Sequence, residues 1–148
     1  MSNKLILWLL LIIPWLTLFF LKKEGIKRYM PVTIFTALLV TIVYEIGYTY
    51  KLWQIKEAIV PWGYITNVSF AYGAFFITTI WIFYFTFRNF WLYLATNIVI
   101  DTFGAWVIIK FVEARKMAHL TISNLSLFLI FVTIALIAYI FEIWYEKV

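Results

Sequence analysis

Five long stretches with almost no charge take up most of this chain. They cover residues 5–21, 29–50, 62–87, 89–109 and 122–145. The hydrocarbon core of a bilayer is about 30 Å thick, so a helix needs about 20 apolar residues to cross it. Lipid offers no partner to an unpaired backbone amide, which favours continuous helix in each stretch. The sequence therefore predicts an all-α, integral membrane helical bundle of about five transmembrane helices, with residues 1–148 forming a single domain.

The composition also indicates that the solvent of this protein is lipid. Of its 148 residues, 66% are hydrophobic and 13% are charged, whereas soluble domains average about 45–50% and about 25%. So few polar residues cannot cover a water-exposed surface. Cysteine is absent, which excludes disulfides, thiolate metal sites and cysteine nucleophiles.

The basic residues lie in the short loops and at the helix ends, and they are evenly divided. Five helices place the N-terminus, the second loop and the fourth loop on one side of the membrane. That side has Lys4, Lys51, Lys56, Lys110, Arg115 and Lys116, and the other has Lys22, Lys23, Lys27, Arg28, Arg88 and Lys147. With six basic residues on each side, the total does not indicate which side faces the cytoplasm. The four basic residues just after the first stretch favour an N-terminus outside the cell. The net charge of +5 indicates contact with lipid headgroups, not nucleic-acid binding.

Three short segments resemble a known group of proteins. These are the run 28–35 (RYMPVTIF), the cluster Tyr44-Glu45, Tyr48 and Tyr50, and the pair Leu52-Trp53. The chain resembles a family of small multi-pass membrane proteins of Bacillus- and Clostridium-type bacteria, loosely over the second to fourth stretches. The resemblance implies a bacterial plasma membrane and assigns no functional residue.

Glu45 and Asp101 are the only charged residues within their stretches. A charge at the centre of a bilayer costs at least ~2.5–3.5 kcal/mol, so each acid needs an explanation. At 1.5 Å per residue, Glu45 lies about 8 Å and Asp101 about 12 Å inside the side that holds the N-terminus. Asn67, early in the third stretch, lies about 6–8 Å inside the same side. The three residues can therefore meet at one depth.

Helical spacing extends this set to a candidate buried polar or ion site. Asn97 lies one turn before Asp101, and Tyr48 shares a side of its helix with Glu45. In one interpretation the acids are structural, either neutral or paired with Lys51, Lys110 or His119. In the other they form a proton or cation site, because an apolar pocket disfavours the charged carboxylate and proton uptake could be exchanged for a cationic substrate. The candidate site comprises Glu45, Tyr48, Asn67, Asn97 and Asp101.

Other polar residues fit simpler roles. Glu142 lies near the end of the last stretch and is expected at the membrane interface, and the single histidine, His119, is expected in solvent or among headgroups. The chain has no H-E-x-x-H zinc motif, no G-x-S-x-G and no phosphate loop. We therefore expect no cofactor, no metal site and no catalytic residue.

Three functional hypotheses follow. The first is a non-catalytic accessory or regulatory membrane protein, because a chain this small without a strong motif is more often a subunit or modulator. Its partners would be the lipid bilayer and either further copies of itself or another membrane protein. The second is a small proton- or cation-coupled transporter that uses Glu45 and Asp101. The third is a membrane-embedded enzyme.

Overall fold

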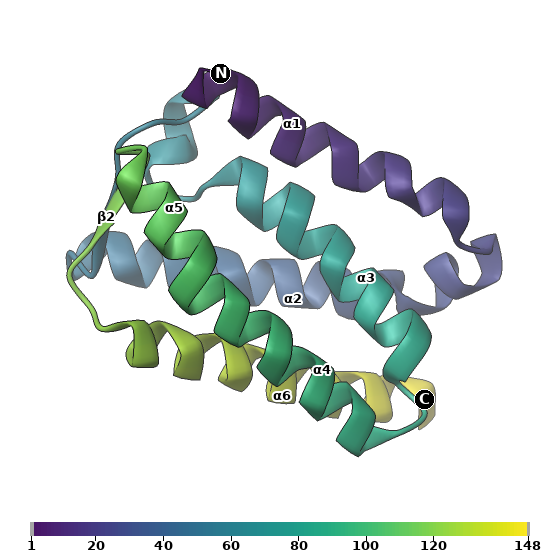
Figure 1. The fold of residues 1–148 in the computed structure, drawn as a ribbon. Coiled ribbons are helices and arrows are strands. Elements are labelled where there is room, and N and C mark those ends of the chain that lie inside the picture. Colours follow the sequence, from purple (N-terminus) through teal and green to yellow (C-terminus); the bar gives the residue numbers. More distant parts are fainter. Residues whose placement is uncertain (1, 148) are drawn as a thin grey trace.

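The computed structural model describes residues 2–147 and confirms an all-α bundle (Figure 1). The α-helices are α1 (Asn3–Leu16), α2 (Lys23–Thr49), α3 (Phe75–Thr86), α4 (Phe90–Thr102), α5 (Ile109–Ala114) and α6 (Asn124–Lys147). A 3-10 turn, η1 (Thr17–Phe20), extends α1, and another, η2 (Pro61–Tyr64), lies in the second loop. The π-helical segment η3 (Phe70–Ala74) leads into α3, and a second one, η4 (Phe103–Ile108), joins α4 to α5.

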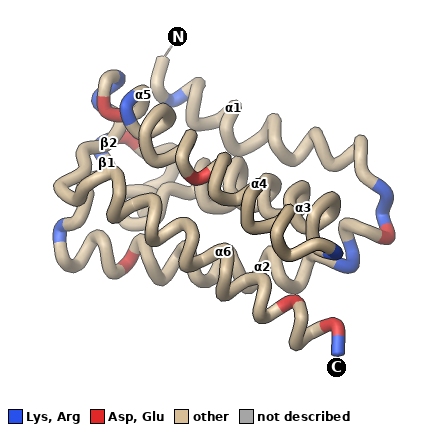
Figure 2. The backbone as a smooth tube through the Cα atoms, turned by 60° about the horizontal axis from the view of Figure 1, so that its bottom comes forward, with Lys and Arg blue, Asp and Glu red and all other residues tan. Residues whose placement is uncertain are grey.

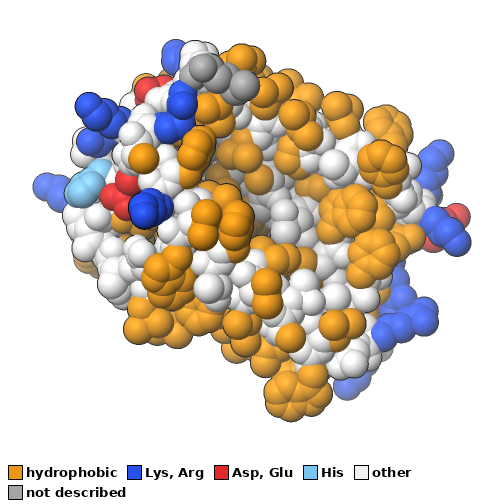
Figure 3. Space-filling view, in the orientation of Figure 1, with side chains coloured by type: hydrophobic (Ala, Val, Ile, Leu, Met, Phe, Trp, Pro, Cys, Tyr) orange, Lys and Arg blue, Asp and Glu red, His pale blue; other side chains and the backbone are white. Residues whose placement is uncertain are grey.

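Within residues 2–147, four helical segments are long and apolar enough to cross a membrane: Asn3–Phe20, Lys23–Thr49, Phe90–Ala114 and Asn124–Lys147. A fifth, Phe70–Thr86, is apolar but shorter. Charged residues concentrate at the two ends of the bundle (Figure 2), and hydrophobic side chains cover the band between them on the face shown in Figure 3. Helix α1 begins and helix α6 ends at opposite ends of the bundle (Figure 1), as expected for an odd number of passes.

Four of the helical segments form a ring. Helix α2 packs against α3 and α6, and α4 packs against the same two helices. Helix α1 lies outside this ring, against η3 and α3. Because each ring helix has two neighbours, its buried side faces the ring interior.

The second and third helices begin several residues away from their predicted positions. Helix α2 starts at Lys23 instead of residue 29, which places Pro31 inside the helix and not in its first turn. Charged residues are compatible with a helix that continues beyond the hydrocarbon, and Glu24 in the first turn complements the positive end of the helix dipole. The third helix was predicted from residue 62, but residues 61–64 form η2 and regular helix follows only after Asn67.

Asparagine side chains mark the starts of two helices. The Oδ1 atom of Asn67 accepts a hydrogen bond from the backbone N–H of Phe70 at 3.2 Å. Asn89 accepts from the N–H groups of Trp91 and Leu92 at 3.1 and 3.2 Å. All three bonds satisfy donors that a helix leaves unpaired at its N-terminus. The helix after Asn89 continues to Ala114, beyond the predicted end at residue 109, and α6 begins at Asn124 instead of 122.

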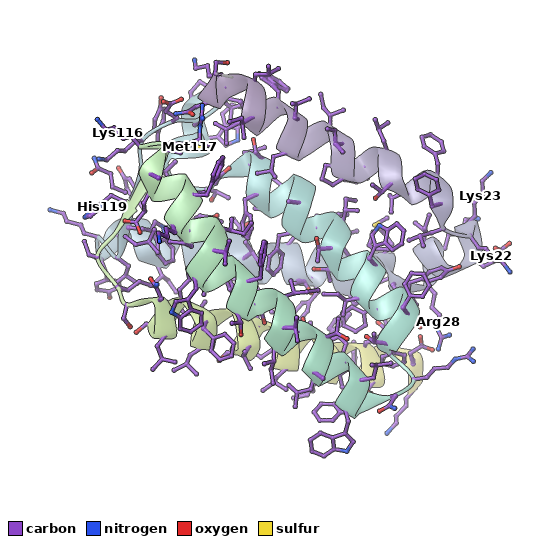
Figure 4. The ribbon with its side chains drawn as sticks, viewed as in Figure 1. Lys22, Lys23, Arg28, Lys116, Met117 and His119 are labelled. Atoms are coloured by element: carbon purple, nitrogen blue, oxygen red, sulfur yellow. The ribbon has the colours of Figure 1, made fainter. Side chains whose placement is uncertain are left out.

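A short antiparallel sheet, which the sequence analysis did not predict, joins the second and fourth loops. Strand β1 (Trp53–Ile55) pairs with β2 (Ala118–Leu120), with Gln54 opposite His119. We call the end of the bundle that holds these strands the strand end. In Figure 4, Lys116 and His119 mark this end, whereas Lys22, Lys23 and Arg28 mark the opposite end.

The two helices that lead into this sheet stop in the same way. Lys51 and Lys116 have left-handed backbone conformations, with φ of 56° and 58°. In each case the next residue returns a backbone hydrogen bond to the last turn, from Leu52 to Gly47 at 2.9 Å and from Met117 to Val112 at 3.0 Å. This is the Schellman arrangement, which satisfies the final carbonyls of a helix. After each of these helix ends the backbone continues as a strand, and the two paired strands cover the strand end of the ring.

Candidate ligand-binding cavity

The ring surrounds a cavity of about 350 Å³ whose lining extends from the two strands to Phe83 and Tyr93, toward the opposite end of the bundle. All four ring helices contribute to its wall, and Trp53, Ile55, Ala118 and Leu120 of the two strands close one end. Figure 3 shows a hollow on the face between α1 and the continuous helix of α4, η4 and α5, bordered by hydrophobic side chains. Leu7 and Leu10 of α1 and Val112 of α5 line the cavity on this side. Its volume lies within the range of small-molecule sites, about 300–1,000 Å³.

Asp101 places a carboxyl group on the wall of this cavity. It is 8% exposed, and Asn97, one turn earlier, is 7% exposed. Tyr93, Asn97, Asp101 and Ala105 follow one another at intervals of four residues, which keeps them on the inward side of the helix. The Nδ2 group of Asn97 donates to the carbonyl of Tyr93 at 2.9 Å. The Oδ2 atom of Asp101 has no hydrogen-bond partner within residues 2–147.

A second unpaired polar atom belongs to the same cavity wall. Trp53, the first residue of β1, lines the cavity, and its buried Nε1–H has no partner within residues 2–147. The indole packs against Gly47, where an added Cβ would lie 2.1 Å from the ring, and meets Tyr44 edge-on at 5.8 Å. A buried polar group without a partner costs about 1–3 kcal/mol. Asp101 and Trp53 thus each contribute a buried polar atom without a partner to a cavity lining that is otherwise mainly apolar.

The structure brings three of the five predicted site residues to this cavity. Asn67, Asn97 and Asp101 all line it. The Asn67 side chain also caps the helix that follows it, so its role includes holding the chain in place. Thr36 of α2 and Tyr93 of α4 lie on the same wall, and the sequence analysis did not select them.

Glu45 and Tyr48 do not reach the cavity. Both are exposed on the outside of α2, Tyr48 by 55%. Helix α2 instead packs through Val32, Thr36 and Val40. Successive residues of a helix point about 100° apart, so burial of this side leaves Glu45 on the outside. The prediction chose the inward side of this helix by its polar residues. In lipid, however, small and closely fitting side chains determine which side packs.

The ion pairs proposed for Asp101 are also not formed. Lys51 and Lys110 are exposed, and the Nδ1 atom of His119 lies 3.4 Å from Glu113 instead. His119 is itself 58% exposed at its side chain, as expected for a residue in solvent or among headgroups. Asp101 is therefore not accommodated by pairing with any of these cations.

Glu142 is the clearest correction to the sequence analysis. It was expected at the membrane interface, but its exposure is 0% and both of its carboxyl oxygens lack a hydrogen-bond partner within residues 2–147. Ala135, Ala138 and Glu142 occur at spacings of three and four on the buried side of α6. That small-residue spacing is the signal that could have placed Glu142 in a helix contact.

Comparison with protein-family models, curated proteins and solved structures gives no match to this chain. Within residues 2–147, no three His, Cys, Asp or Glu side chains lie close enough together to hold a metal ion. The function has to be inferred from the cavity and its polar groups.

Proposed function

We propose that this chain is a small, non-catalytic multi-pass protein of a bacterial plasma membrane that binds a lipophilic amine in its cavity. Asp101 would act as the counter-ion of the amine. The observation that supports this proposal is the unpartnered Oδ2 atom of a carboxyl group that is 8% exposed and lines a cavity of about 350 Å³.

The chemistry of the wall favours an amine over other ligands. An apolar site disfavours an isolated carboxylate, so the group needs either a proton or a positively charged partner. An ammonium group supplies both the charge and the N–H donors that Oδ2 lacks, and charge-assisted hydrogen bonds are the stronger kind. The Nε1–H of Trp53 could donate to a hydroxyl or ether oxygen of the same ligand. The apolar remainder of the wall suits a hydrocarbon body.

Binding of this kind exchanges one cation for another. Without a ligand, Asp101 holds a proton, and an incoming ammonium group takes the place of that proton. The exchange suits a regulatory protein that senses a lipophilic compound. It also suits the second candidate, a proton-coupled carrier, in which Asp101 alone and not the pair with Glu45 performs the coupling.

The test compares ligands that differ only in their polar group. Decylamine, decanol and decanoate are titrated against the protein in lipid nanodiscs, with empty nanodiscs as the reference for partitioning. We expect the wild type to prefer the amine, and Asp101→Asn to lower its affinity about 100-fold, equivalent to about 2.7 kcal/mol. Glu45→Gln is the matched control, because that acid lies outside the cavity, and it should leave the affinity unchanged.

Two results would reject the proposal. One is equal binding of the three compounds by the wild type, and the other is an unchanged amine affinity in Asp101→Asn. Counterflow of labelled amine in proteoliposomes then separates the two candidates, since only a carrier exchanges internal for external amine.

A further inference from the structure

A second buried acid lies at the other end of the bundle from the cavity strands. Glu142 is in the last two turns of α6, with an exposed fraction of 0%. Neither Oε1 nor Oε2 makes a hydrogen bond of good geometry within residues 2–147, and the polar side chain that approaches Glu142 most directly is another carboxyl group, that of Glu146. An ionised carboxylate in this condition is strongly unfavourable, because it loses its hydration and gains no compensating contact. Glu142 therefore needs either a bound proton or a nearby cation.

A cation is close, but it is engaged elsewhere. The Nε atom of Arg28 on α2 lies 2.6 Å from Oε1 of Glu146, which is one helical turn beyond Glu142 on the same side of α6. The Arg28 guanidinium also lies over the rings of Tyr29 and Phe87, at 5.2 and 5.8 Å from their centres. Figure 4 places Arg28 at the end of the bundle where Lys22 and Lys23 also lie.

The surroundings of Glu142 contain few other groups that could share its charge. The charged side chains near it are Arg28 of α2 and Glu146 of α6. Tyr29 of α2 lies near Glu142 and also near Arg88, in the turn between α3 and α4, and Tyr139 precedes Glu142 by three residues on α6. The Tyr139 hydroxyl already donates to the carbonyl of Phe87 at 3.0 Å. Tyr29 and Tyr139 belong to a buried hydrophobic cluster with Phe83 and Tyr93, and the latter two residues also line the cavity.

The exposed pair provides the connection to water. The side chains of Arg28 and Glu146 are 40% and 30% exposed, so this pair is open to water, and Arg28 would move inward from Glu146 to reach Glu142, which is 0% exposed. We infer that Glu142 is a proton-binding site, and that release of its proton to water transfers the Arg28 guanidinium from Glu146 to Glu142. The transfer would change the contact between α2 and α6 at this end, because Arg28 belongs to one helix and both acids to the other.

The experiment measures the proton on Glu142 directly. A hydrophobic carbodiimide reacts with protonated carboxyl groups in lipid, and mass spectrometry of the digested protein identifies the labelled residue. In the full chain in nanodiscs, we expect labelling of Glu142 at low pH that declines as the pH rises. In Arg28→Gln, labelling should persist to a pH about one unit higher, because the cation that replaces the proton is gone. Arg28→Lys keeps the charge and should fall between the two.

Two variants separate this site from the rest of the molecule. Glu142→Gln keeps the shape of the side chain and should abolish the label, and Asp101→Asn should leave the Glu142 profile unchanged. Absence of Glu142 labelling at every pH in the folded wild type would overturn the inference, and so would identical profiles in the wild type and Arg28→Gln. Gel filtration of each variant confirms that the labelled protein is folded.

Discussion

Asp101 and Glu142 have the same functional group and nearly the same burial, yet their neighbours differ. Asp101 borders a cavity of about 350 Å³, and Lys51 and Lys110, the cations proposed for it, are exposed. Glu142 adjoins a closely packed aromatic cluster and an Arg28–Glu146 ion pair at the surface. Burial makes both carboxylates unfavourable. Asp101 has free space beside it and Glu142 has a cation nearby. This difference determines whether a bound molecule or the Arg28 side chain compensates the buried carboxylate.

This comparison shows why burial alone does not define a site in a membrane protein. The space beside Asp101 can admit a molecule, so the acid is suited to bind one. Glu142 does not line this cavity, so we expect its response to come from side chains already present, Arg28 and Glu146. The predictions below test this difference.

The largest effect we expect is a pH dependence of amine affinity at Asp101. The bound state requires the carboxylate, so each ligand that binds releases one proton. On the acid side of the Asp101 titration, affinity should therefore rise about tenfold per pH unit, and two units correspond to about 2.7 kcal/mol. Titration of decylamine at several pH values, together with proton release in weakly buffered solution, measures this slope.

The control for this slope is Asp101→Asn, which should bind the amine weakly and with no dependence on pH. Glu142→Gln should keep the slope of the wild type. If the wild type showed no pH dependence and released no proton, the ligand would not be replacing a proton on Asp101, and the contrast between the two acids would disappear.

A smaller effect separates free space from close packing. Gly104 lies on the cavity wall, three residues after Asp101, and a Cβ added there would meet only Phe131, at 3.6 Å. A Cβ added at Gly73 would lie 2.6 Å from backbone atoms of Leu10 and Leu11 in α1. Gly73→Ala should therefore destabilise the protein by about 1–3 kcal/mol, since α1 has to move. Gly104→Ala should be neutral or stabilising by about 0.5–1 kcal/mol, because glycine weakens a helix interior.

Unfolding of the two variants by a denaturing detergent in mixed micelles measures both changes against the wild type. Equal destabilisation by the two alanines would mean that the region beside Asp101 is as tightly packed as the contact between α1 and η3.

The smallest effect concerns the exposed partner of Arg28. Exposed ion pairs contribute about 0.2–1 kcal/mol, and the side chains of this pair are 40% and 30% exposed. Glu146→Gln should lower the free energy of unfolding by less than about 1 kcal/mol, because Arg28 can then turn to Glu142. The same detergent titration measures it. A loss above about 2 kcal/mol would show that the pair itself holds α2 to α6 and that Arg28 has no alternative partner.

The sequence predicted the class of fold and one part of the candidate site, the side of α4 that carries Asn97 and Asp101. Charge-poor stretches predicted the helical bundle because a bilayer imposes length and hydropathy on every span. The spacing of Asn97 and Asp101 placed them together on one side of a helix, and the structure turns that side inward. Asp101 could be recognised because a lone carboxylate in an apolar stretch needs a reason.

The incorrect predictions all concern contacts between segments that lie apart in the sequence. The inward side of α2 is chosen by the fit of Val32, Thr36 and Val40 to other helices, and polarity did not reveal it, so Glu45 was placed inside. Glu142 was placed at the interface because depth was counted along the helix, whereas its burial comes from the sideways packing of α6 against neighbouring helices, which are α2 and α4. The β1–β2 pair joins residues far apart in the sequence, and three-residue strands carry too little pattern to be recognised alone.

The sheet that covers the strand end has a consequence for how the cavity would fill. Its strands lie across the water-facing end of the ring, whereas the hollow beside the cavity lies between α1 and α4–α5, in the hydrophobic band (Figure 3). A ligand that uses this route arrives after dissolving in the membrane. Occupancy then follows its concentration in the lipid, which for a lipophilic amine greatly exceeds that in the surrounding water. A site with modest intrinsic affinity would therefore respond to traces of such a compound outside the cell, and partitioning would rank compounds as strongly as their contacts with Asp101.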